Sequence, residues 1–146
     1  MQITKYSDFA LRVLIYLGLA EGRPVTISEV ADRYGVSKNH LMKVVHHLAR
    51  AGLVETRRGK GGGMTLGRPA DEIVVGRVLR ATEATSGPLV ECFDARTNTC
   101  PIAESCALHG MLRQAEAAFY DTLDRFTLTD LLAAKHDLRI LLKIAP

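Results

Sequence analysis

The chain has 146 residues, which is enough for one domain or for two small domains that share a surface. Hydrophobic residues make up 47% and charged residues 24%, so the composition excludes a disordered chain and a fibrous repeat. The longest uncharged apolar run, Val13 to Ala20, is too short to span a bilayer, and Asp8 and Arg12 interrupt any signal-peptide core. We therefore expect a cytoplasmic protein with no membrane partner.

Positive charge is concentrated in the first half of the chain. The net charge at pH 7 is +3, but residues 1–70 hold eleven Lys and Arg against five Asp and Glu, whereas residues 71–146 hold eight against eleven. A basic half indicates a polyanion such as nucleic acid as its partner, and an acidic half indicates sensing or assembly. We predict a DNA-binding domain over residues 1–70 and a sensing and dimerisation part over residues 71–146.

The first fifty residues predict three helices. The apolar residues between positions 8 and 20 form a run too long for a strand and predict a buried helix. Thr26 and Glu29 have the spacing of a capping box for a short second helix, which we expect to end at Gly35. Ser37 is then the N-cap of a third helix, whose inner side carries Leu41, Val44, Val45, Leu48 and Ala49. Helix, glycine-containing turn and helix predict a helix-turn-helix.

A basic, glycine-rich hairpin is predicted next. Residues 53–56 and 64–66 have strand character and flank the loop of residues 57–63. Beside a helix-turn-helix, such a hairpin is a wing that places cations on the DNA backbone or in the minor groove. Gly59-Lys60-Gly61 lacks the Ser or Thr and the following helix of a nucleotide-binding loop. The sequence also offers no nucleophile with a partnered base, so we expect a DNA-binding protein and not an enzyme.

The predicted DNA contacts come from the start of the third helix and from the wing. A recognition helix uses the polar residues near its N-terminus for base edges and phosphates. The predicted contact residues are Ser37, Lys38, Asn39, His40, Lys43, Arg57, Arg58 and Lys60.

The same helix carries two adjacent histidines, His46 and His47. Their side chains point about 100° apart, so they cannot hold one metal ion.

The second half predicts more helices. We expect a helix over Ile73–Ala84, a break at Thr85–Pro88, and then a loop with a short helix that carries the cysteines. An amphipathic helix over Met111–Phe126 has an apolar stripe that predicts pairing with a second copy of the chain, formed by Leu112, Ala115, Phe119 and Leu123. Thr127 and Asp130 have the spacing to start a closing helix over Leu131–Ala134. The predicted fold is mainly α-helical, a winged helix-turn-helix with a long dimerisation helix.

Three cysteines lie close together in the sequence, with the spacing Cys92-x7-Cys100-x5-Cys106. An odd number cannot pair internally, and a cytosolic chain rarely keeps disulfides. The spacing is neither that of a zinc ribbon nor that of a thioredoxin motif. Three thiolates fit an iron–sulfur cluster that takes a fourth ligand from elsewhere, but a zinc site and structural cysteines stay open as alternatives.

The fourth ligand has two candidates. His109 lies three residues after Cys106, on the same side of the segment if it is helical, and imidazole can bind iron. Asp8 is the other candidate, although an acidic residue at the start of a helix also has a favourable interaction with the helix dipole. Spacing alone favours His109.

Four stretches resemble the NsrR branch of the Rrf-type iron–sulfur transcription regulators. They are the opening residues 4–12, the wing residues 57–66, residues 98–102 together with Cys106, and residues 128–131. The wing and the three cysteines are shared with the regulators IscR and RirA, whereas Asp8 is a feature of the nitric-oxide-sensing NsrR group. The seven-residue spacing of the first two cysteines also suits RirA, and His109 occupies the place of the histidine ligand of IscR.

The resemblance implies a dimeric repressor of a palindromic operator. It implies a 4Fe-4S cluster held by Cys92, Cys100 and Cys106, with Asp8 of the partner subunit as the fourth ligand; a 2Fe-2S cluster is the alternative. Nitrosylation or loss of the cluster is then expected to release the double-stranded DNA. The alternatives are a regulator that responds to iron or cluster supply, with His109 in the fourth position, and a cluster-free thiol or zinc switch.

Overall fold

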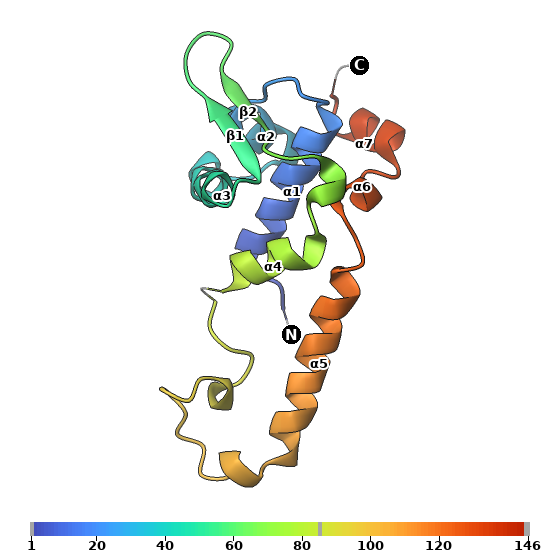
Figure 1. Ribbon diagram of the computed structural model, residues 1–146. Coiled ribbons are helices and arrows are strands. Elements are labelled where there is room, and N and C mark those ends of the chain that lie inside the picture. The colour runs from blue at the N-terminus through green and yellow to red at the C-terminus, as the bar shows by residue number, and fades with distance from the viewer. Residues whose placement is uncertain (1, 85, 145–146) are drawn as a thin grey trace.

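The computed structural model describes residues 2–84 and 86–144. Its helices and strands are α1 (Lys5–Leu19), α2 (Ile27–Tyr34), α3 (Lys38–Arg50), β1 (Val54–Arg57), β2 (Gly63–Leu66), α4 (Val75–Glu83), α5 (Ala107–Leu123), α6 (Leu128–Leu131) and α7 (Lys135–Leu141). Short 3-10 turns at 70–72, 91–93 and 103–105 join them. The molecule is elongated, and after α5 the chain returns to α1, so that α6 and α7 lie beside it (Figure 1). The fold is mainly α-helical, as predicted. No helix in the described ranges is long and apolar enough to cross a membrane.

The predicted helix-turn-helix is confirmed. The Thr26 hydroxyl caps α2 by accepting a hydrogen bond from the Glu29 backbone N–H at 3.1 Å. Helix α2 ends at Gly35, whose φ of +63° is the left-handed conformation that glycine adopts without strain. Ser37 is the extended residue before α3, but its hydroxyl makes no capping hydrogen bond in the described chain. The apolar sides of α2 and α3 then pack against α1 in one core.

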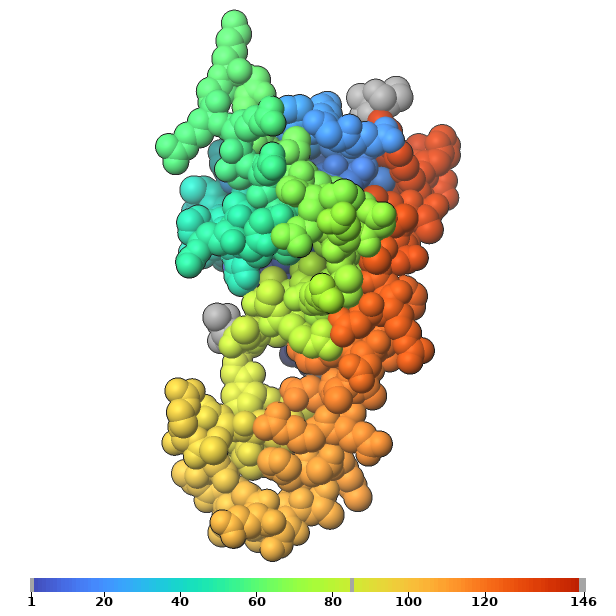
Figure 2. All heavy atoms as spheres, in the orientation of Figure 1, coloured from blue at the N-terminus to red at the C-terminus, as the bar shows by residue number. Residues whose placement is uncertain are grey.

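The predicted wing is also present. Strands β1 and β2 pair in antiparallel register, from Val54 opposite Leu66 to Arg57 opposite Gly63. Val25 adds a third, single-residue strand, because its N–H and C=O bond to Met64 at 3.0 and 2.7 Å. This bridge fixes the hairpin to the start of the helix-turn-helix. Its loop projects from one end of the molecule, away from the body (Figure 2).

The predicted division into residues 1–70 and 71–146 stays a prediction, and the two stretches share one hydrophobic core. Ile73, Val78, Leu128 and Ile144 are buried in the same cluster as the apolar residues of α1 and α3. The elements after residue 70 that supply them are the turn before α4, α4 itself, α6 and the end of the chain. Helix α5 and the preceding loop lie outside this core and extend below it (Figures 1 and 2).

Several predicted boundaries in the second half were wrong. Helix α5 covers Ala107–Leu123 and not Met111–Phe126, because Cys106 is its N-cap and the chain turns at Asp124 to meet α4. The closing helix begins at Leu128, directly after the Thr127–Asp130 capping box, where the Thr127 N–H donates to Asp130 Oδ2 at 2.7 Å. It ends at Leu131, and a separate helix, α7, follows. Thr85, in the predicted break after α4, lies outside the described residues.

Candidate nucleic-acid interface and cysteine loop

The polar residues at the start of α3 are exposed, as a recognition helix requires. Leu41, Val44, Val45 and Leu48 are buried against α1 and α2, so packing fixes which side of α3 faces away from the core. The five predicted contact residues on this helix are all exposed, and they are Ser37, Lys38, Asn39, His40 and Lys43. The helix therefore presents them together at one surface of the domain.

The wing carries its three predicted contact residues, Arg57, Arg58 and Lys60, on exposed positions of the hairpin. The loop is tight, and the Gly62 N–H bonds to the Gly59 carbonyl at 2.9 Å. A Cβ atom on Gly62 would lie 2.3 Å from the Arg57 carbonyl oxygen, so only glycine fits there. The glycines thus let the loop fold back closely and direct its cations outward.

Most cations of the first half have no acidic partner. In the described chain only Arg12 and Arg23, of the eleven Lys and Arg in residues 1–70, form salt bridges, with Asp8 and Glu29. Five of the eight in residues 71–146 do so. Cations without a salt bridge remain available to a polyanion, and several of them lie on the exposed surfaces of the helix-turn-helix and the wing.

The start of α1 connects this surface to the rest of the molecule. The Asp8 carboxylate accepts from Arg12 Nε at 3.1 Å and forms an ion pair with Arg12 Nη2 at 2.8 Å. The Arg12 guanidinium lies 5.6 Å from the ring centre of Tyr34 on α2, where burial raises the pKa of the phenol to about 12. Phe9 stacks on His40 of α3, with ring centres 6.4 Å apart. Residues next to Asp8 therefore contact both helices of the helix-turn-helix.

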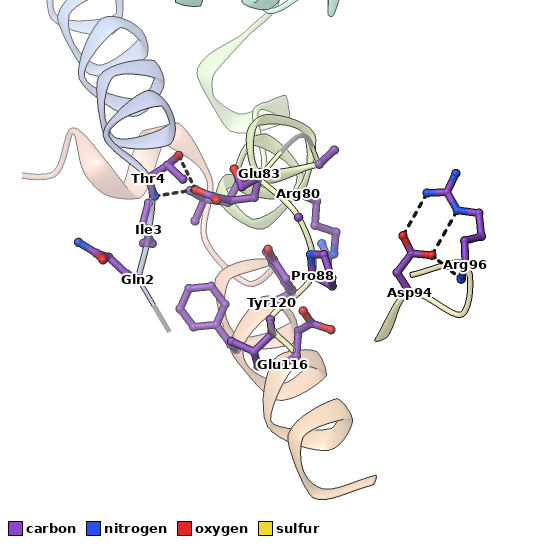
Figure 3. A pocket seen from close by; sticks show the side chains of 16 residues that line it. Gln2, Ile3, Thr4, Arg80, Glu83, Pro88, Asp94, Arg96, Glu116 and Tyr120 are labelled. Carbon is purple, nitrogen blue, oxygen red and sulfur yellow. Dashed lines mark hydrogen bonds and ion pairs between the residues drawn. The ribbon is translucent and has the colours of Figure 1, made fainter. Parts of the chain in front are cut away.

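A second anchor holds α1 at α4, beside a cavity of about 620 Å³ (Figure 3). The Glu83 carboxylate accepts hydrogen bonds from the backbone N–H and the hydroxyl of Thr4, both at 2.9 Å. Burial alone would raise the pKa of Glu83, but hydrogen bonds from Ser7 and Thr4 bring it below the ordinary glutamate value. Tyr120 of α5 and Arg96, in the segment that carries the three cysteines, line the same cavity, which thus lies between α1 and that segment.

The cysteine loop, residues 86–106, is held against the first turns of α5. Arg113 donates a hydrogen bond to the Phe93 carbonyl at 3.0 Å, and its guanidinium lies 3.7 Å from the centre of the Phe93 ring. The same ring contacts His109, with ring centres 5.3 Å apart. Because Cys92 precedes Phe93 and Cys106 precedes α5, these contacts bring two cysteine-bearing segments to one end of the helix.

The three cysteines are free, half-buried thiols. Among the described residues, however, no group of three or more His, Cys, Asp or Glu side chains is placed to hold one metal ion. The structure therefore brings the cysteine-bearing segments to one region, but the three sulfur atoms do not converge on one metal position. Asp8 does not lie with them either. The Nδ1 atom of His109 is buried and has no hydrogen-bond partner within residues 2–84 and 86–144.

This donor set fits an iron–sulfur cluster in its chemistry. Three thiols on one loop match the thiolate preference of such clusters, and a buried imidazole nitrogen without a partner is a further available ligand. The loop would have to close around such a cluster, since the three thiols lie apart. Sequence reasoning found all of these residues, but it missed Arg113, Glu83 and Thr4, which position the loop and α1 through contacts distant in sequence.

Helix α5 buries none of its 17 residues. Its predicted stripe is partly covered within the chain, because Leu112, Phe119 and Leu123 are half-buried. The more exposed apolar side chains are Leu108 and Met111, which are 58% and 65% exposed. With Ala115, they lie three and four residues apart and form one side of the helix. A long helix with this much uncovered apolar surface is typical of an interface between subunits.

Comparisons with known proteins agree with this architecture. Residues 3–134 match the model of the Rrf2 family, described as an iron-dependent transcriptional regulator. The chain is 45% identical to the HTH-type transcriptional regulator NsrR of Bacillus subtilis over 99% of both chains, and 43% identical to NsrR of Shouchella clausii over 98% of this chain and 96% of that one.

Solved structures show the same fold. CymR of B. subtilis, described as the global cysteine regulator, matches with a TM-score of 0.70 and 26% identity over 92% of this chain and 98% of that one. IscR of T. potens matches with a TM-score of 0.67 and 24% identity over 90% and 86%. The chain therefore belongs to the Rrf2 family of transcriptional regulators, and the curated relatives that it resembles along nearly its full length are of the NsrR type.

Proposed function

We propose that the chain is a dimeric repressor that binds a palindromic operator and releases it when nitric oxide attacks an iron–sulfur cluster. The observation that carries this proposal is the similarity to NsrR regulators at 42–45% identity along nearly the whole chain. The three free thiols, the exposed recognition helix and the uncovered side of α5 support its separate parts. Two-fold symmetry of a dimer matches the symmetry of a palindrome.

Cys92, Cys100 and Cys106 would hold a 4Fe-4S cluster, with Asp8 of the partner subunit as the fourth ligand and a 2Fe-2S cluster as the alternative. When bound, the cluster supplies iron that nitric oxide can bind in place of a weak oxygen ligand. The three thiols are half-buried, so solvent would have limited access to a cluster that they hold. Arg113 holds the segment that carries Cys92 against α5. The residues that respond to the signal are then those around Asp8.

Asp8 has two alternative partners under this proposal. Within its own chain the carboxylate pairs with Arg12, and in the loaded dimer it would point to the partner subunit. Its neighbour Phe9 packs on His40 of the recognition helix, and Arg12 lies over Tyr34 of α2. Exchange of the Asp8 partner is expected to shift α1 against both helices. A shift of a few Å in each subunit changes the distance between the two recognition helices. The helices then no longer match the spacing of the two half-sites of the operator.

An anaerobic titration tests the proposal. Iron analysis and visible absorption of protein purified without oxygen establish whether a cluster is present. Nitric oxide is then added while binding to a duplex selected by the protein from a random pool is followed by fluorescence anisotropy. We expect affinity to fall in step with the loss of cluster absorption. Unchanged binding after complete nitrosylation would contradict nitric oxide as the signal.

A regulator of iron or cluster supply is the second candidate, and the buried, unpartnered Nδ1 of His109 favours it. Under this hypothesis His109 holds the fourth position, as the resemblance to IscR implies. The two variants Asp8→Ala and His109→Ala separate the candidates. We expect Asp8→Ala to alter the stability or absorption of the cluster and His109→Ala to leave both unchanged; the reverse assigns the position to His109. Colourless protein that contains no iron would instead support a cluster-free thiol or zinc switch.

A further inference from the structure

A cationic groove runs between the first turns of α1 and the outer side of α3. It consists of two adjoining hollows of about 540 and 270 Å³, and both are lined by Tyr6 and Lys43. The larger is also lined by His46 and Arg50, and the smaller by Lys5. None of the described residues that line either hollow is acidic. Of the described lining residues, Lys43 and His40 belong to the DNA-contact surface predicted from the sequence, whereas Lys5 and Arg50 do not.

Aromatic contacts fix the geometry of the groove. The Tyr6 ring lies 5.8 Å from the His47 ring, and its hydroxyl donates to the Lys43 carbonyl at 3.4 Å. Together with the Phe9–His40 contact, these residues occupy positions of α3 spaced by three and four, so α1 packs along one side of that helix. The groove is therefore built by the fold and not by the chance orientation of surface side chains.

The cations of the groove have no internal partner. Lys5, Lys43 and Arg50 are exposed, and none forms a salt bridge within the described chain. Lys43 and Arg50 lie seven residues apart, on the same side of α3, which brings two positive charges together along the helix. Like charges placed together repel one another unless an anion lies between them. The charge pattern thus favours an external anion at this place.

The position of the groove identifies the anion. Helix α3 has 13 residues and is roughly 20 Å long, whereas the major groove of DNA is about 12 Å wide. If the N-terminal turn of α3 reads base edges, its second half passes over the backbone at the rim of the groove. Figure 1 shows the wing on one side of α3 and the start of α1 on the other. The wing and the α1–α3 groove thus flank the recognition helix.

We propose that the α1–α3 groove is a second phosphate-contact site, in which Lys5, Lys43 and Arg50 hold the DNA backbone on the side of the recognition helix opposite the wing. This inference rests on the proposed mode of DNA binding and extends its footprint to the first turn of α1. That turn also carries Asp8. A phosphate bound there would make operator affinity sensitive to the position of the segment that is proposed to bind the cluster.

The test is the salt dependence of DNA binding. The variants Lys5→Gln and Arg50→Gln are each expected to reduce the slope of log affinity against log salt by about 0.9, and the double variant by about twice that amount. The loss of affinity should be the same factor on the selected duplex and on a scrambled one, because phosphates carry no sequence information. Arg50→Lys keeps the charge and should keep the slope. Equal melting temperatures and cluster absorption confirm that the variants are intact.

Two controls distinguish failure of this inference from failure of the proposed function. Arg125→Gln removes an exposed cation that forms no salt bridge in the described acidic half, and it should leave the slope unchanged. Arg58→Ala removes a wing cation and should lower the slope. If Arg58→Ala lowers it and the Lys5 and Arg50 variants do not, the groove is not a phosphate site. If all three variants match the wild type, the proposed DNA interface itself is wrong.

A map of the DNA backbone provides a second readout. Neutral methylphosphonate groups are introduced one position at a time into the selected duplex. A position in the groove should weaken binding of the wild type and have no further effect on Arg50→Gln, since that contact is already lost. If every position weakens both proteins equally, Arg50 does not contact a phosphate.

Discussion

Helices α1 and α5 have similar lengths but different surroundings. Seven of the 15 residues of α1 are buried, whereas none of the 17 residues of α5 is. Helix α1 has α3, α4, β2, α6 and α7 around it, and it contributes residues to the large core. Helix α5 contacts α4 and the cysteine loop, and its remaining surface faces solvent. Burial of an apolar side supplies most of the stability of a helix in a protein.

The same contrast holds for charge. The half around α1 leaves nine of eleven cations without a salt bridge in the described chain, and the half around α5 leaves three of eight. The first region completes its core and keeps its charges free, as expected of a surface that binds a polyanion. The second pairs its charges and leaves apolar surface and thiols free. Under the proposed function, a second copy of the chain and a cofactor would complete it.

The largest expected effect comes from removing one thiol. Cys106→Ser should lose the iron and, with it, operator binding, because two thiolates on this loop are too few to hold a cluster. The melting of the core around α1 should change little, since Cys106 lies outside it. Iron analysis, anisotropy and thermal unfolding measure the three properties. Ser105→Ala, at an exposed neighbouring position, is the control that should keep all three. Retention of iron by Cys106→Ser would contradict its role as a ligand.

A charge on the exposed apolar side of α5 tests whether a second copy of the chain packs against it. Met111→Glu places a carboxylate at a side chain that is 65% exposed, so the subunit should fold normally. In a dimer the two charges would be desolvated, and we expect a monomer in sedimentation equilibrium. Operator affinity should fall by about 100-fold or more, because the two half-sites are no longer bound together.

Ala117→Glu is the matched control for the α5 variant. Ala117 is also exposed on α5, but it points away from the side formed by Leu108 and Met111. It should remain a dimer with normal affinity. If Met111→Glu is still a dimer, this side of α5 is not the interface between subunits.

The contrast also explains how much the sequence could predict. The three helices and the wing of the first region follow from local signals: apolar spacing, the cap at Thr26, and glycines where the chain turns. Packing and local preference agree there, so the predictions held. In the second region, Gly110 breaks the apolar pattern and concealed the true start of α5 at Ala107. A helix that buries nothing has only a weak apolar signal to mark its ends.

The candidate site was predictable only in part. The cysteines, Asp8, His109 and the wing cations are visible in the sequence because their residue types and spacing carry the chemistry. The contribution of Lys5 and Arg50 is not, because it depends on α1 packing along α3. Convergence of the three thiols is likewise not visible in this chain alone, since under the proposed function the loop would have to close around a cofactor. Long-range packing and external partners are what the linear pattern omits.

A smaller effect tests whether a cation without a salt bridge in the first region contacts a DNA phosphate. Arg58→Ala should weaken binding to selected and scrambled duplexes by the same factor and reduce the salt slope by about 1, because one phosphate contact is lost. The absorption of the cluster should not change, since the wing lies at the opposite end of the molecule from the cysteine loop (Figure 1). An unchanged slope would exclude a phosphate contact of Arg58 and leave the wing without its proposed role.

The smallest effect concerns Glu83, which joins α4 to the start of α1. Its pKa is lower in the folded protein than in the unfolded chain, so its charged form stabilises the fold. This contribution is present above the unfolded pKa and is lost as the pH falls through the folded one. Glu83→Gln keeps the size of the side chain but weakens the two hydrogen bonds from Thr4. We expect a loss of about 1 kcal/mol in the free energy of unfolding at neutral pH.

The difference between wild type and Glu83→Gln should shrink as the solution is acidified below the ordinary glutamate range, because both side chains are then neutral. Urea unfolding at neutral and acidic pH measures it, and Glu104→Gln, at an exposed position in the cysteine loop, should match the wild type at both. If the difference for Glu83→Gln is independent of pH, the charge of Glu83 does not hold α1. The first turn of α1 would then owe its position to the packing of Tyr6 and Phe9 on α3. In that case the contacts that place α1 on the DNA-binding surface would be independent of α4 and of the loop that follows it.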